Sequence, residues 1–336
     1  MIVALDAMGG DHGPSVNVEA AMLTIKNFKH IDVLLVGREE ILARELSTHG
    51  YSGDRISILN ATETVEMDES PSLALRRKKD SSLRRSVEMV RDGLADAAVS
   101  AGNSGAMMAF GLFLLRAAEG VERPALAAAM PSEKTPFLFL DMGANVDCSP
   151  DNLFQFACMG SAYATHVMNI EKPRVALLSI GEEANKGNEL TKDAYKLLEA
   201  SRMNFIGNIE SKAIFRGDAD VVVCDGFAGN VFLKTTEGLA DILLKMIKQE
   251  IMSSTMAKIG YLFMRSAMKR VAKRVDYDEY GGATLLGLNG ACIITHGRAS
   301  AKAIMSGIRE ASDYAEKKVY ERISMEIKSY YEPKQQ

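Results

Sequence analysis

The sequence predicts an α/β fold, a three-layer α/β/α arrangement in which helices cover both faces of a mainly parallel sheet. Three observations support this. Short apolar runs alternate with segments of helical spacing along most of the chain. Several runs are uninterrupted, as at 221–224, which is typical of strands covered on both faces. Many runs also end in a glycine-containing turn that precedes a helix, so we expect one domain over residues 1–336.

The individual elements follow from these patterns. Apolar runs predict strands at 2–5, 32–36, 55–59, 95–100, 135–140, 174–180, 205–209, 221–224 and 291–295. Segments of helical spacing predict helices at 15–28, 39–47, 82–92, 107–117, 151–168 and 190–200, from 231 onward, and through most of 299–330. Pro14 stands where the first of these helices would open, a position that proline favours.

Composition excludes some classes of protein. The longest apolar runs fall well short of the roughly 20 residues that span a bilayer, and no basic region precedes the first strand. We therefore expect a protein that is neither secreted nor membrane-spanning. The cysteines are far apart and form no C-x-x-C pair, which favours reduced core thiols over disulfides or zinc ligands. They are Cys148, Cys158, Cys224 and Cys292.

Five predicted strands end in turns that combine glycine with Asn, Asp, Lys or His. The turns lie at 6–13, 100–105, 141–147, 181–189 and 225–230. One such turn alone is most simply a tight turn. Because ligands of open α/β sheets bind outside the carboxyl ends of the strands, five together indicate one cleft. We expect it to hold a small anion by backbone N–H groups, with little free apolar surface.

Familiar catalytic signatures are missing. The chain has no G-x-x-x-x-G-K-[ST], no G-x-G-x-x-G followed by an acidic residue about twenty positions on, and no G-x-S-x-G. Cys224 adjoins a candidate turn, but it lies in an apolar run where burial would raise the pKa of its thiol. A bound nucleophile that attacks directly is therefore favoured over a covalent enzyme intermediate.

Two segments are strongly basic. Six basic residues fall within 76–85, which form either a solvated face or an anion-binding arm. Residues 245–274 carry eight basic residues against one acidic, a net charge of +7 that leaves −11 on the rest of a chain whose total is −4. The second segment is also Met-rich, and Ser253-Ser254 predicts a break between two helices. This amphipathic hairpin, 239–275, would meet an anionic membrane, receive an acidic protein or pack in a dimer.

Several of these segments together resemble the bacterial phosphate acyltransferases of the PlsX family, in order and over nearly the whole chain. The matching segments are 6–14, 74–82, 99–106, 141–147, 225–231, 280–283 and 296–297. We expect Thr more often at Ser104 and Ala228, and Pro at Thr284, in this family.

The resemblance implies a reaction in which fatty acyl–acyl carrier protein and inorganic phosphate give acyl phosphate and free carrier protein. The acyl phosphate would then serve a membrane glycerol-3-phosphate acyltransferase at the start of phosphatidic acid synthesis. The implied fold is that of isocitrate and isopropylmalate dehydrogenases, shared with phosphotransacetylases. The implied protein is a cytoplasmic homodimer at the inner face of the cell membrane, without cofactor, metal or nucleic acid.

Candidate site residues follow from the matching motifs. For phosphate and the rest of the substrate they are Gly10, Arg76, Lys79, Asn103, Ser104, Gly105, Gly229 and Lys234. For the oxyanion that develops at the thioester they are Asn145 and Asn230. The leaving thiolate, with a pKa near ~8.5 by analogy with Cys, departs readily, and His12, Lys186 or His296 could protonate it. Asp141 and Asp225 would orient a Lys or His, and Lys258, Leu262, Phe263 and Arg265 would contact the membrane.

Three alternatives stay open. A nicotinamide-dependent dehydrogenase of the same fold needs a ribose-binding acid and a carboxylate cluster for a metal, and neither can be assigned. An acyl-CoA phosphotransacetylase would share the cleft but has no use for the basic hairpin. A non-catalytic membrane scaffold explains the hairpin but leaves the five polar turns without a role.

Overall fold

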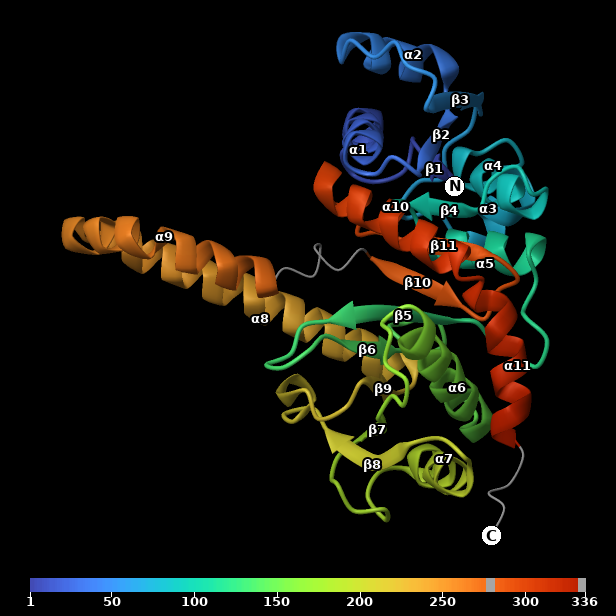
Figure 1. The fold of residues 1–336 in the computed structure, drawn as a ribbon, viewed down its shortest axis with the longest axis vertical. Helices are drawn as coiled ribbons and strands as arrows, with labels where there is room; N and C mark the ends of the chain where they lie inside the picture. The colour runs from blue at the N-terminus through green and yellow to red at the C-terminus, as the bar shows by residue number, and fades with distance from the viewer. Residues whose placement is uncertain (276–281, 332–336) are drawn as a thin grey trace.

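The computed structural model describes residues 1–275 and 282–331, and the side chains of 272–275 and 331 lie outside that description. Its strands are β1 Ile2–Asp6, β2 Asp32–Gly37, β3 Ile56–Asn60, β4 Ala97–Ser100, β5 Ala125–Met130, β6 Phe137–Leu140, β7 Val175–Ser179, β8 Phe205–Glu210, β9 Val221–Val223, β10 Ala283–Leu286 and β11 Ala291–Ile294. Its α-helices are α1 Gly13–Asn27, α2 Glu39–Thr48, α3 Pro71–Arg77, α4 Ser82–Arg91, α5 Ser104–Leu114, α6 Pro150–His166, α7 Glu189–Ala200, α8 Gly226–Ser253, α9 Thr255–Val275, α10 Ala301–Glu316 and α11 Val319–Tyr331. A short 3₁₀ helix, η1, covers Ile214–Arg216 (Figure 1).

All strands join one sheet in the order β3-β2-β1-β4-β11-β10-β5-β6-β9-β7-β8. The group from β3 to β11 is parallel, and so is the group from β6 to β8. Between them β10 pairs antiparallel with both neighbours, and β5 pairs antiparallel with β6. Sequence patterns predicted neither β5 nor β10, because β5 is alanine-rich, a composition that strands disfavour, and β10 lies within a glycine-rich stretch, 281–290, that reads as a loop.

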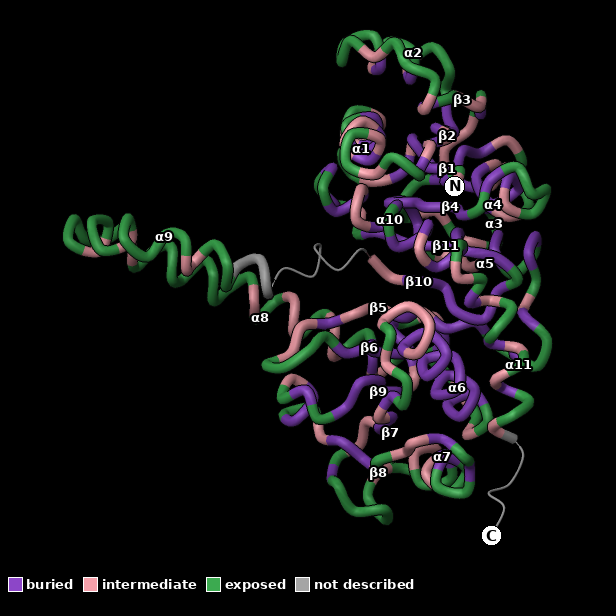
Figure 2. The backbone as a smooth tube through the Cα atoms, in the orientation of Figure 1, coloured by how far each residue is buried: buried purple, intermediate pink, exposed green. Residues whose placement is uncertain are grey.

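Alternate residues of each strand enter different cores, which makes the fold the expected α/β sandwich. Val3 and Leu5 pack in the core beneath α1, α6, α7, α10 and α11, whereas Ala4 faces the opposite side of the sheet. On that side α3, α4 and α5 cover one half of the sheet, and the first turns of α8 cover the other. Figure 2 shows the sheet and α6 as largely buried.

The strand register explains how turns from the two parallel groups meet. One row across the middle of the sheet is Val99, Ile293, Thr284, Ala127, Leu140 and Val223. β4 ends one residue beyond this row, at Ser100, and β6 ends in it, at Leu140. The two groups of parallel strands run in opposite directions. They are also shifted along the strand axis, so that both groups have their carboxyl ends near this row. Turns after β4 and β6 can therefore face each other across β10 and β5.

The predicted hairpin is confirmed as a long arm that projects from the body (Figure 1). α8 ends at Ser253 and α9 begins at Thr255, so the break lies where Ser253-Ser254 indicated it. α8 begins earlier than position 231, at Gly226, because the Asp225 side chain caps it. Two of the basic residues counted in the sequence, Lys273 and Arg274, have side chains outside the described part.

No helix in the described part of the chain combines the length and the apolarity that crossing a membrane requires.

Candidate active site

A cleft lies on the sheet face that α5 and α8 share, and it holds two adjoining cavities of about 330 and 240 Å³. Five residues line both cavities, which makes them one continuous site: Ser104, Leu126, Met142, Asn230 and Ile294. Four of the five predicted turns contribute to its lining, those at 6–13, 100–105, 141–147 and 225–230. The middle strands β5 and β10 form its floor through Leu126, Ala128 and Leu285.

One wall of the cleft is the N-terminus of α5. The Asn103 Oδ1 atom accepts the N–H of Ala106 at 2.9 Å, the N-cap contact of the helix. Its Nδ2 atom donates to the carbonyls of Glu66, Met67 and Glu69 at 2.9–3.1 Å. The side chain is thus fully engaged with backbone, so in this structure it positions the helix and does not point a donor at a ligand.

The first turn of α5 faces the cleft directly. Ser104 lines both cavities and Gly105 lines the smaller one. Residues this early in a helix lie too near its start for their N–H groups to reach a carbonyl four positions back. A Cβ at position 105 would lie 2.7 Å from Pro71 Cγ, so glycine lets α3 pack closely here. The open N–H groups and the helix dipole make this wall favourable for an anion.

The opposite wall is the N-terminus of α8, which packs against the turn at 141–147. The Asp225 carboxylate accepts the N–H of Ala228 at 2.9 Å, and Gly226 donates its N–H to the carbonyl of Asn145 at 2.7 Å. A Cβ at Gly229 would lie 1.8 Å from the Asp141 carbonyl oxygen, closer than any real contact. Glycine at 229 is therefore a packing requirement, and it fixes the helix end relative to the turn.

Asp141 holds the turn at 141–147 together. It is fully buried, and its carboxylate accepts the backbone N–H groups of Leu126, Ala144 and Asn145 at 2.7–3.1 Å. It also accepts the Asn145 Nδ2 at 2.9 Å. Burial raises the pKa of Asp141, and these hydrogen bonds counteract the rise. The expectation that Asp141 orients a Lys or His is wrong, because its partners are amides.

Asn145 is buried by the same contacts, and its Nδ2 also donates to the carbonyl of Pro124 at 2.8 Å. The side chain that faces the cleft is Asn230, which is exposed and lines both cavities. Of the two amides expected to stabilise an oxyanion, Asn230 is thus the one in position to meet a ligand.

Asp6 holds the turn after β4 in place, as Asp141 holds the turn after β6. The sequence analysis did not name Asp6 as a site residue. Its buried carboxylate accepts the Ser100 hydroxyl at 2.7 Å, and that hydroxyl accepts the N–H of Gly102 at 2.9 Å. Burial raises the pKa of Asp6. A signal was present in the sequence, since an acidic residue ends the apolar strand β1 at Asp6 and another directly follows the apolar strand β6 at Asp141.

His296 lies at the rim of the cleft and lines the larger cavity. Its Nδ1 atom accepts the N–H of Arg298 at 3.1 Å, so Nε2 carries the proton in the neutral ring. The turn at 6–13 is tied to it, because Asp11 donates its N–H to the carbonyl of Gly297 at 2.8 Å. Gly10, with φ +91°, packs against Ala101 in the same place.

Of the further candidate residues His12, Lys234, Arg76 and Lys79, Lys234 alone lines the cleft. His12 is exposed at the start of α1, makes no side-chain cap contact and is not among the lining residues. Lys234 lines the larger cavity, and its Nζ lies 2.9 Å from the Glu237 carboxylate. Arg76 and Lys79 are exposed on and just after α3, which packs on α5.

Lys186 is not brought to the cleft. It lies exposed in the turn after β7, and no residue of 181–189 lines either cavity. The reason is strand order, because β9 separates β7 from β6, whose following turn reaches the cleft.

The expectation of little apolar surface is also wrong. Leu126, Ala128, Met142, Leu233 and Ile294 line the larger cavity. The apolar floor comes from the middle strands, which the sequence did not predict.

Cys224 matches its prediction, since it is buried and burial raises the pKa of its thiol well above the usual range. Across the described residues, no three His, Cys, Asp or Glu side chains are grouped as metal ligands.

The fold is similar to that of solved phosphotransacetylases. The phosphotransacetylase EutD from Staphylococcus aureus aligns with a TM-score of 0.62 at 19% identity, covering 94% of each chain. A phosphotransacetylase from Streptococcus pyogenes aligns with a TM-score of 0.61 at 18% identity, again covering 94% of each chain. At such identities the likeness concerns the fold alone.

Sequence comparison identifies the family. The family model described as "Fatty acid synthesis protein" matches residues 1–322. A phosphate acyltransferase of Thermodesulfovibrio yellowstonii is 52% identical over 322 residues, 96% of this chain and 93% of that protein. One of Trichlorobacter lovleyi is 50% identical over 331 residues, 98% of this chain and 96% of that protein. The chain belongs to this family, and the resemblance to the bacterial phosphate acyltransferases is confirmed.

Proposed function

We propose that the protein converts a fatty acyl–acyl carrier protein and inorganic phosphate into acyl phosphate and free carrier protein. The observation that carries the proposal is that the N-termini of two helices, α5 and α8, face one cleft whose floor is apolar. Helix N-termini favour a phosphate, and an apolar floor favours the alkyl part of an acyl group. Relatives about 50% identical are named phosphate acyltransferases, which agrees with this chemistry.

The phosphate would lie against the first turn of α5. Backbone N–H groups at Ser104 and Gly105, with the Ser104 hydroxyl, would bind its oxygens, and the dipole of α8 opposite would favour its charge. Phosphate oxygen is already anionic, so positioning supplies much of the rate without a base. Asn103 and Asp225 contribute by capping the two helices.

The reaction then needs one bond formed and one broken. A phosphate oxygen attacks the thioester carbonyl carbon, and the carbonyl oxygen becomes an oxyanion that the Asn230 amide could bind. As the oxyanion re-forms the carbonyl, the carbon–sulfur bond breaks, and its electron pair leaves on the carrier sulfur as a thiolate. His296 holds a proton at Nε2 and lies at the rim, which makes it the best-placed group to protonate this sulfur.

The acyl carrier protein, an acidic partner, would dock on the basic surface beside α5. Arg76 and Lys79 are exposed there, whereas Arg84 and Arg85 already pair with Glu88 at 2.9 and 3.2 Å. Part of the basic run is therefore structural, and part is free to meet an acidic protein.

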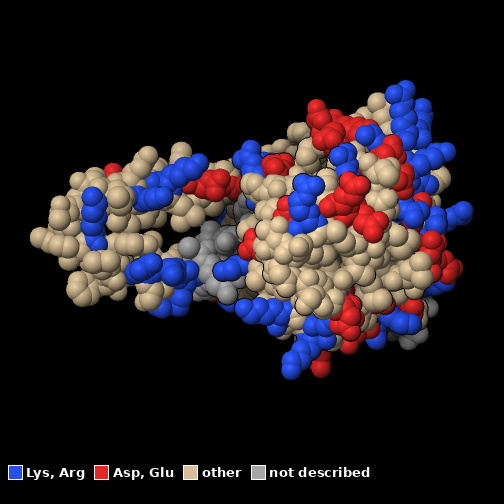
Figure 3. Space-filling view, turned by 90° about the horizontal axis from the view of Figure 1, so that it is seen from above, with Lys and Arg blue, Asp and Glu red and all other residues tan. Residues whose placement is uncertain are grey.

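The hairpin would hold the protein at an anionic membrane, where a poorly soluble acyl phosphate is best delivered to a membrane glycerol-3-phosphate acyltransferase. On α9 Leu262 is 68% exposed and Phe263 is 86% exposed, and Lys258 and Arg265 lie on the same helix. Figure 3 shows Lys and Arg along the arm with few acidic residues, while the body mixes both signs. Apolar groups with flanking cations are what interfacial helices use.

The proposal also includes a homodimer, in which the hairpins of two protomers pack together. Leu239, Ile242, Leu243 and Met246 on α8 are 49–57% exposed, a long apolar strip for which a second hairpin is a suitable cover.

Product analysis tests the proposed reaction. The protein is incubated with palmitoyl–acyl carrier protein and phosphate, and acyl phosphate is trapped with hydroxylamine. We expect phosphate-dependent hydroxamate with the carrier substrate and little with palmitoyl-CoA. Equal or better use of acyl-CoA would point to a phosphotransacetylase, NAD⁺ reduction to a dehydrogenase, and no turnover of any kind to a scaffold.

A further inference from the structure

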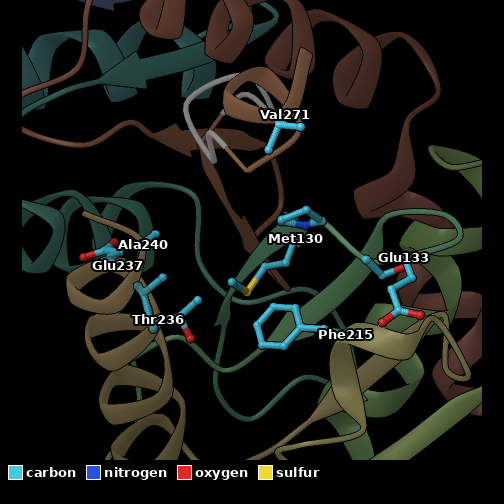
Figure 4. A pocket seen from close by; sticks show the side chains of 10 residues that line it. Met130, Glu133, Phe215, Thr236, Glu237, Ala240 and Val271 are labelled. Carbon is cyan, nitrogen blue, oxygen red and sulfur yellow. The ribbon is translucent and has the colours of Figure 1, made fainter. Parts of the chain in front are cut away.

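A second apolar cavity lies next to the cleft, at the base of the hairpin, with a volume of about 490 Å³. Its walls come from four places in the chain: Met130 at the end of β5, Phe215 in η1, Leu233 and Ala240 on α8, and Val271 on α9. Figure 4 shows Met130 and Phe215 in the centre, with the helix that carries Thr236 and Ala240 on one side. We call this cavity the hairpin chamber.

We propose that the hairpin chamber receives the distal part of the fatty acyl chain and sets the chain length that the enzyme prefers. The inference rests on the proposed function, which places the reacting carbonyl in the cleft. It adds a binding site and the residues that limit its size.

Continuity with the cleft is the first argument. Met130, Leu233 and Glu237 line both the hairpin chamber and the larger cavity of the cleft. An acyl chain that starts at the helix N-termini can therefore pass over the apolar floor at Leu126 and Ala128 and enter the chamber beside Leu233. A larger but open cavity of about 720 Å³ near α2 and β3 shares no lining residue with the cleft, so it cannot take the same chain.

The chemistry of the walls is the second argument. Methionine, proline, phenylalanine, leucine, alanine and valine side chains supply most of the surface, which suits an alkyl chain. The acidic residues of the chamber are Glu133 and Glu237, and the latter forms its ion pair with Lys234. Among the described residues that line the chamber none is basic, so an anionic occupant such as the phosphates of a nucleotide would find no counter-charge, whereas an uncharged alkyl chain needs none.

The apolar walls of the chamber have a limited extent, and on the hairpin side they end at Ala240 on α8 and Val271 on α9. Each methylene buried there should raise kcat/KM about fourfold until the space is filled. Beyond that length the gain should stop, which gives a preferred chain length.

Two adjacent threonines on α8 provide a matched test. Thr236 lines the chamber, and Thr235 is exposed and does not. The full-length variants Thr236→Phe and Thr235→Phe add the same bulk to the same helix. kcat/KM is measured for each with butyryl–, octanoyl– and palmitoyl–acyl carrier protein, and Ala240→Phe serves as a second chamber variant.

We expect Thr236→Phe and Ala240→Phe to lower the palmitoyl-to-butyryl ratio of kcat/KM at least tenfold, and Thr235→Phe to leave that ratio within twofold of wild type. Equal losses for all three chain lengths, or no change in the ratio, would overturn the chamber assignment. If the wild type forms no acyl phosphate from any of these thioesters, the proposed function fails. In that case displacement of a fluorescent long-chain fatty acid still tests the chamber, which requires weaker binding in Thr236→Phe than in Thr235→Phe.

Discussion

Gly229→Ala should disable the cleft while leaving the fold in place. An added Cβ would lie 1.8 Å from the Asp141 carbonyl oxygen, whereas ordinary contacts begin at 3.4 Å, so α8 and the turn at 141–147 must separate by about 1.6 Å. A displacement of about 1 Å at a reacting centre can cost on the order of 10²-fold in rate, and we expect at least that loss in kcat/KM for phosphate. Overpacking should also destabilise the protein by about 1–3 kcal/mol.

Gly238→Ala is the matched control, because it lies on the same helix with no atom within 4 Å of an added Cβ. It should keep wild-type kcat/KM and gain up to about 1 kcal/mol from helix propensity. Steady-state kinetics at varied phosphate, with thermal denaturation and circular dichroism, compare the two variants. A folded Gly229→Ala enzyme with kcat/KM within twofold of wild type would refute the idea that the end of α8 forms part of the site.

Three further predictions concern other parts of the molecule. Asp141→Asn replaces an acceptor of four N–H groups by a side chain that offers one oxygen, and thermal denaturation should show a loss of about 2 kcal/mol or more. Burial raises the pKa of Glu310 from its ordinary value of 4.5 to about 7. The folded protein therefore keeps a proton that the unfolded chain loses, and Glu310 costs stability as the pH rises through this window, by about 3 kcal/mol in all. Glu310→Gln should remove this pH dependence. Charge reversal of Lys258 and Arg265 to Glu should weaken binding to anionic vesicles at least tenfold, since each basic residue near such a surface contributes about 1 kcal/mol.

Each of these three has an outcome that contradicts it. Wild-type stability in Asp141→Asn would mean that the carboxylate does not hold the turn. A wild-type pH profile in Glu310→Gln would assign the dependence to another group. Charge reversal at Lys172, which is exposed on the body, is the control for the hairpin variant. Unchanged vesicle binding by the Lys258 and Arg265 variant would remove the membrane proposal, and its activity in solution should stay near wild type.

The sequence predicted the parallel strands and the hairpin because their signals are local. Uninterrupted apolar runs such as Val221–Val223 and the break at Ser253-Ser254 depend only on neighbouring residues. β5 escaped prediction because its alanines carry little strand preference, and its place in the sheet comes from pairing with β10 and β6.

Those two unpredicted strands also explain one of the errors about the site. They make the apolar floor of the cleft. The position of Lys186 has a separate cause, because β9 lies between β7 and β6 and keeps the turn after β7 away from the cleft. Residue type identified Asn103, Asp141 and Asn145 as important, but not their roles. Only the contacts show that these side chains hold backbone in place, whereas Ser104, Asn230 and His296 face the cleft.

A single-turnover experiment tests most directly the claim that bound phosphate attacks the thioester itself. Enzyme in excess is mixed with palmitoyl–acyl carrier protein without phosphate, and the mass of the protein and the amount of free carrier protein are followed with time. The structure, with Cys224 buried as a thiol of raised pKa, predicts no acyl adduct and no carrier release until phosphate is added, when both products form together. Carrier release without phosphate, with a protein mass increased by one palmitoyl group, would contradict the account.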